Sequence, residues 1–87
     1  MKIEEQLLIS AVRYALGRMS YIVGTTCEFI TNNADRLSDN CIHVIIQDIE
    51  GELERYHSMG ETCGMECDEK EWNRLLNTLK ERKHNNA

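Results

Sequence analysis

Apolar side chains recur at three- and four-residue intervals in four segments of the chain, which is the spacing of helices that bury one face. The first segment predicts a helix over residues 3–16, and Gly17 is placed to end it in a left-handed cap. Its expected buried stripe contains Ile3, Leu7, Leu8, Ala11, Val12, Ala15 and Leu16.

The second segment predicts a helix over residues 21–33, with Ser20 as its N-cap. Five of its side chains are expected to face the core: Ile22, Val23, Thr26, Phe29 and Ile30. An alternative keeps one continuous helix through Gly17, because a four-three alternation of apolar positions persists from Leu8 to Phe29. The composition of residues 32–36 predicts a turn after this segment.

The third segment has the most regular apolar face in the chain and predicts a helix over residues 38–58, capped by Ser38. That face consists of Ile42, Ile45, Ile46, Ile49, Leu53 and Tyr56. A loop with two glycines follows over residues 59–67. The fourth helix is expected over residues 69–82 after a capping box that begins at Asp68, with a buried stripe of Trp72, Leu75, Leu76 and Leu79.

The absence of proline favours uninterrupted helices, and no linker or repeat divides the 87 residues. We therefore predict an all-α fold, a small four-helix domain that occupies residues 1–87. A domain of this size buries only about 60–65% of the surface of its unfolded chain, so oligomerisation would help to stabilise it. We expect neither an export signal nor a membrane-spanning segment, because no long apolar run is present.

Negative charge is concentrated between Asp48 and Glu71, where nine acidic residues stand against two basic ones. This segment repels nucleic acid, so direct nucleic-acid binding is not expected. Its helical part, with Asp48, Glu50, Glu52 and Glu54, is a candidate acidic face for a basic protein partner. The basic residues that follow, from Arg74 to Lys83, are interpreted as a solvated helix face.

The cysteines are interpreted as free thiols of a cytosolic protein. His57, Cys63 and Cys67 could supply three zinc ligands, with Cys27 or Cys41 as a fourth. Only one closely spaced pair exists, so we expect no metal and no other cofactor. No nucleophile motif, phosphate loop or metalloprotease motif is present, and we do not expect an enzyme.

Arg13, Tyr14, Arg18 and Tyr21 stand out because they interrupt an otherwise apolar run. Arginine binds carboxylate or phosphate through paired hydrogen bonds, and tyrosine rings stack on bases. These four residues could bind a nucleotide or another small anion. Alternatively, the arginines pair with acidic residues of the later helices, and we favour this structural role for Arg13.

The segments AVRYALGRMSYIVG, IIQDIEGELE and CDEKEWNRLL together resemble a group of small proteins encoded in bacteriophage and prophage genomes. The resemblance covers most of residues 7–79, and its specific part is the RYALGR-x-SY core. That group has no assigned activity. The resemblance implies an accessory protein made in the cytoplasm of a bacterial host.

Phage accessory proteins of this kind commonly act by stoichiometric binding. The resemblance therefore favours a non-enzymatic inhibitor of a host protein, such as a CRISPR or other anti-phage defence component. The alternative function is that of a small protein that binds or sequesters a nucleotide or similar anion. Self-association into a homo-oligomer is compatible with either function.

Overall fold

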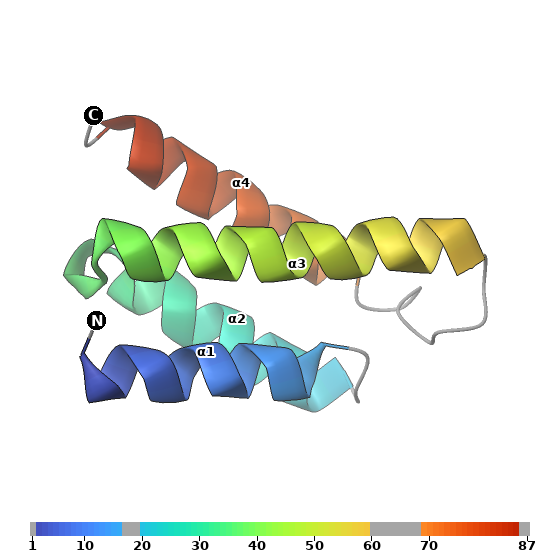
Figure 1. The fold of residues 1–87 in the computed structure, drawn as a ribbon, viewed down its shortest axis with the longest axis horizontal. Helices are drawn as coiled ribbons and strands as arrows, with labels where there is room; N and C mark the ends of the chain where they lie inside the picture. The colour runs from blue at the N-terminus through green and yellow to red at the C-terminus, as the bar shows by residue number, and fades with distance from the viewer. Residues whose placement is uncertain (1, 17–19, 60–68, 86–87) are drawn as a thin grey trace.

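Each of the four predicted segments forms an α-helix in the computed structural model, which describes residues 2–16, 20–59 and 69–85. The all-α, four-helix prediction is confirmed, and no strand occurs in these ranges (Figure 1). The elements are α1 (Ile3–Ala15), α2 (Ser20–Asn33), the 3-10 turn η1 (Ala34–Arg36), α3 (Asp39–Met59) and α4 (Glu69–Asn85).

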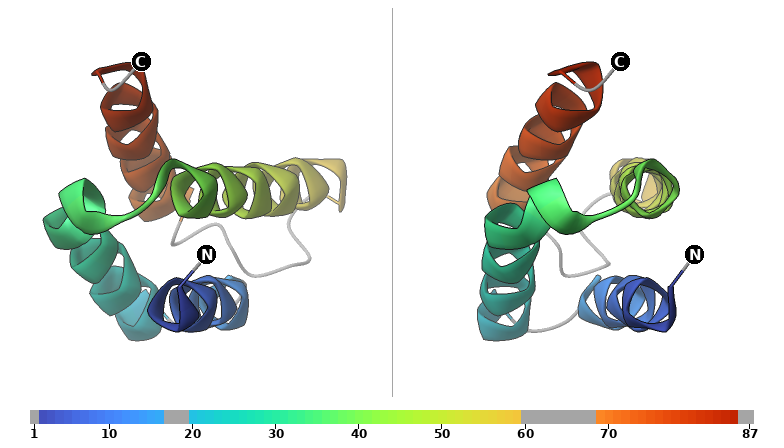
Figure 2. Two further views of the ribbon diagram at one scale, coloured as in Figure 1. Left: turned by 60° about the vertical axis from the view of Figure 1, so that its left-hand side comes forward. Right: turned by 90° about the vertical axis from the view of Figure 1, so that its left-hand side faces the viewer.

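The helices occupy the corners of a four-sided bundle (Figure 2). α1 packs on α2 and α3, and α4 packs on the same two helices from the other side. α2 and α3 therefore lie diagonally across the bundle, and the connection between them crosses one end. We call this connection, residues 34–38, the crossover.

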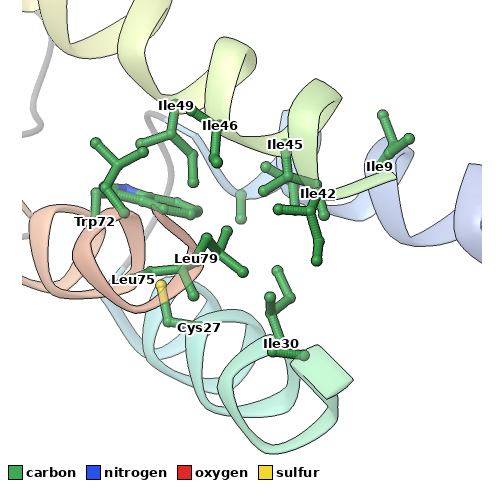
Figure 3. Packing of buried hydrophobic residues seen from close by; sticks show 14 of the residues in the cluster. Ile9, Cys27, Ile30, Ile42, Ile45, Ile46, Ile49, Trp72, Leu75 and Leu79 are labelled. Atoms are coloured by element: carbon green, nitrogen blue, oxygen red, sulfur yellow. The ribbon is translucent and has the colours of Figure 1, made fainter. Parts of the chain in front are cut away.

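The core is centred on the apolar face of α3, as its sequence predicted. Ile42, Ile45 and Ile49 are fully buried, and they face the α4 residues Trp72 and Leu79 across the interior (Figure 3). One hydrophobic cluster includes buried residues of all four helices. The indole Nε1 of Trp72 is buried and has no hydrogen-bond partner within the described residues.

The predicted buried stripe of α1 is wrong in part. Ile3 and Leu7 are 78% and 70% exposed, whereas Ile9, which was not assigned to the stripe, is buried with Val12 and Ala15. The helix carries apolar residues on two opposite sides, both at helical spacing, so periodicity alone does not decide which side is buried. The side that packs on α2 and α3 is the one that contains Ile9 and Val12.

Phe29 is a second correction, because it was expected in the core and is 55% exposed. Its neighbour Ile30 is fully buried with Val23 in the α2 side of the core, and Phe29 lies one position away from that stripe. The alternative of one continuous helix is also wrong. α1 ends at Ala15, and Leu16 adopts an extended backbone, while the predicted cap at Gly17 lies outside the described residues.

None of the described helices is long and apolar enough to cross a membrane.

A matched pair of isoleucine substitutions tests the assignment of the core. Ile49→Ala should lower the free energy of unfolding by about 2–5 kcal/mol, because it leaves a cavity in a packed interior. Ile3→Ala removes the same atoms from an exposed site and should change it by less than about 0.5 kcal/mol. Urea titration of both variants makes the comparison, and equal losses would show that α3 does not form the core.

Candidate functional site

Glu5 of α1 is a buried carboxylate that holds the start of α3. Its Oε2 accepts a hydrogen bond from the backbone N–H of Ser38 at 2.7 Å, and its Oε1 accepts one from the Ser38 hydroxyl at 3.0 Å. The Ser38 Oγ in turn accepts the backbone N–H of Cys41 at 3.2 Å, which confirms Ser38 as the N-cap of α3. Glu5 therefore supplies the negative charge that a helix N-terminus attracts.

These contacts set the ionisation of two neighbouring groups. The pKa of Glu5 is lowered below its ordinary value, chiefly by the hydrogen bond from the Ser38 backbone, although burial opposes this shift. Burial, with a smaller effect from the Glu5 charge, raises the pKa of the Cys41 thiol to about 11. Cys41 is thus a protonated thiol at neutral pH.

Arg82 of α4 holds the crossover from the opposite side. Its Nε donates to the carbonyl oxygen of Ala34, and its Nη2 donates to those of Asp35 and Leu37, both at 3.3 Å. The Arg82 side chain is only 15% exposed. The interpretation of the basic residues after Arg74 as a solvated face is therefore wrong for Arg82, because its guanidinium binds three carbonyl groups of the crossover.

Arg13 pairs with Asp48 of α3, which agrees with the structural role favoured for it. Its Nε lies 2.7 Å from Oδ2, and its Nη2 donates to Oδ1 at 3.5 Å. The Asp48 hydrogen bond raises the pKa of Arg13 further. Tyr14 is 58% exposed on another side of α1. Arg18 and the side chain of Tyr21 lie outside the part that the structure describes, so the predicted Arg/Tyr cluster is seen only at two of its four residues.

The four carboxylates of the predicted acidic face do not share one side of α3. Residues two positions apart point in nearly opposite directions, because each residue advances the helix by about 100°. Asp48 pairs with α1, Glu50 lies 2.6 Å from the Lys80 Nζ of α4, and Glu52 is half-buried. Glu54 is exposed to solvent.

The candidate zinc ligands are only partly within the described residues. Cys27 and Cys41 are buried free cysteines, and Cys63 and Cys67 lie outside the described ranges. The His57 Nε2 is 2.6 Å from Glu69 Oε1, and this side-chain contact joins the end of α3 to the start of α4. Among the described side chains, no three potential ligands converge on one point.

The outer surface of α2 is the site that sequence analysis missed. Thr25, Glu28 and Asn32 lie between two hollows and line both of them, and Phe29 lines only the second. One is a groove of about 530 Å³ between α2 and α4, where Glu71, Arg74 and Leu75 form the α4 wall. The other is a shallower hollow of about 280 Å³ that also touches Asn33. We call Thr25, Glu28, Phe29 and Asn32 the α2 ridge.

No protein-family model matches the chain, and the comparisons with curated proteins and with solved structures give no significant match.

The Glu5 contacts predict a specific acid sensitivity. Because its folded-state pKa is lowered, Glu5 stabilises the fold above its ordinary pKa of 4.5, and this stabilisation is lost as the pH falls through the lower folded-state value. Glu5→Gln should therefore unfold at lower urea concentration than wild type near neutral pH, and the difference should shrink at acidic pH. Glu4→Gln, an exposed neighbour, is the control. A pH-independent difference for Glu5→Gln would contradict the assignment.

The contacts of Arg82 predict that two arginines of α4 differ in their effect on stability. Arg82→Ala should lower the free energy of unfolding by about 1.5–3 kcal/mol, because hydrogen bonds from a charged donor to three carbonyls are lost. Arg74→Ala, at a side chain that is 77% exposed, should change it by less than about 0.5 kcal/mol. Urea titration measures both, and equal effects would show that the Arg82 contacts do not hold the crossover.

Proposed function

We propose that the protein is a non-enzymatic accessory protein of phage type that binds and inhibits a host protein through the α2 ridge. The observation that carries the proposal is Phe29, a large aromatic side chain that is 55% exposed and lines the shallower of the two hollows. Buried aromatic anchors contribute most of the binding energy in many protein interfaces. Hollows on both sides of the ridge give a partner's side chains places to insert.

The charged residues of the site region support binding rather than catalysis. Glu5, Arg13 and Arg82 hold helices together by the contacts described above. Glu28 of the ridge and Arg74 on the facing α4 wall are both exposed, as expected for the polar rim of an interface.

The net charge of −5 indicates what kind of partner is favoured. An acidic protein associates faster with a basic one, since the opposite fields steer the encounter. Nucleic-acid-binding proteins of host defence, CRISPR effectors among them, carry basic surfaces of this kind. The resemblance to phage-encoded proteins favours the same class of target.

The proposal is tested in bacteria that carry a defined defence system, by the efficiency of phage plating with and without the protein. Wild type should restore plating. Phe29→Ala should weaken binding to the purified target by about 30-fold, the loss of a typical anchor residue.

Gln47→Ala, on the exposed side of α3, is the control and should act as wild type. Full inhibition by Phe29→Ala would exclude the α2 ridge as the contact surface. Failure of wild type to inhibit any of a panel of defence systems would contradict the function itself.

A further inference from the structure

We infer that the outer face of α1 is a self-association surface that packs against α1 of a second copy in an antiparallel pair. The face carries Ile3, Leu7 and Tyr14, which are 78%, 70% and 58% exposed, with Ser10 and Ala11 between them. We call these five residues the α1 stripe. This surface is separate from the function proposed above and does not depend on it.

The spacing of the α1 stripe is that of a helix-pair seam. Ile3, Leu7, Ser10 and Tyr14 follow each other at intervals of four, three and four residues, the alternation by which two helices interlock side chains. The residues that pack inside the domain, such as Ile9 and Val12, occupy the opposite side of the same helix. α1 can therefore keep its place in the bundle while its outer face contacts another helix.

The distribution of large and small side chains makes the stripe complementary to itself when the second helix runs in the opposite direction. A two-fold axis between Leu7 and Ser10 places Leu7 of each copy over the small residues Ser10 and Ala11 of the other. Ile3 then lies beside Tyr14 of the other copy. A parallel pair would instead place Leu7 against Leu7 and leave the small residues facing each other, which packs less well.

Charge also favours a second copy on this face over the other faces of the molecule. The chain as a whole carries −5, so two copies repel each other at most orientations. The five residues of the α1 stripe carry no charge, so a second copy can contact this face without bringing like charges into direct contact.

The size of the face sets the strength of the association. α1 has 13 residues and is therefore about 20 Å long, so one helix pair covers less than the roughly 800 Å² per partner of a stable complex. The dimer should thus form in a concentration-dependent way, with the monomer dominant in dilute solution.

Sedimentation equilibrium of the whole chain under reducing conditions, from micromolar to near-millimolar concentration, tests the inference. The apparent mass of wild type should rise from one chain toward two. Leu7→Glu should stay at one chain with unchanged helix content, since the site is exposed in the monomer. Gln47→Glu adds the same charge on α3 and should dimerise as wild type does.

Leu7→Glu mixed with Ser10→Lys should regain association, because residues 7 and 10 face each other across the two-fold axis. The inference is overturned if wild type remains at the mass of one chain at every concentration. It is equally overturned if Leu7→Glu associates as strongly as wild type, or if the mixture fails to regain the dimer. None of these outcomes bears on whether Phe29 is needed for inhibition, so the two proposals fail separately.

Discussion

The arrangement of the bundle depends on how the crossover is held at its two ends. The connection between α2 and α3 crosses one end of the bundle, where a helix finishes and another begins, so unpaired carbonyl and N–H groups meet there. Arg82 of α4 donates to the carbonyls on one side, and Glu5 of α1 accepts from Ser38 on the other. The negative charge of Glu5 matches the partial positive charge at the start of α3. The two helices that the crossover does not connect thus fix its path (Figure 2).

The sequence predicts the helices of this protein better than it predicts the contacts between them. α3 and α4 each have one apolar face, so periodicity predicts which side is buried, and Ser38 is recognisable as a cap from local residues alone. α1 has two apolar sides, and only packing against α2 and α3 decides between them. The contacts of Glu5 and Arg82 join residues 33 and 48 positions apart, and no local pattern carries that information.

The same contacts change how the candidate site residues are understood. Arg13 was a candidate ligand for a small anion, although a structural role was favoured for it, and Asp48 was a candidate contact for a basic protein. The two side chains bind each other. Glu50 is paired with Lys80 in the same way. Charged residues that the sequence suggested as ligand-binding groups thus form ion pairs within the bundle. Several apolar side chains that the sequence placed in the core are instead exposed. The large apolar side chains that are exposed are those of Ile3, Leu7, Tyr14 and Phe29. Most of them were expected in the core, because burial was predicted from hydrophobicity. In a domain this small, surface apolar groups are better candidates for interaction than its charges are.

The central claim, that two side chains act on one crossover, is tested most directly by a double-mutant cycle between Glu5 and Arg82. If Glu5 and Arg82 hold the same crossover, removing either side chain loosens the crossover. The other side chain then contributes less to the free energy of unfolding. The double variant Glu5→Gln with Arg82→Ala should therefore lose less free energy of unfolding than the two single variants together, by at least about 0.5 kcal/mol. Strict additivity would contradict the account, because it would show that the two contacts stabilise independent parts of the fold.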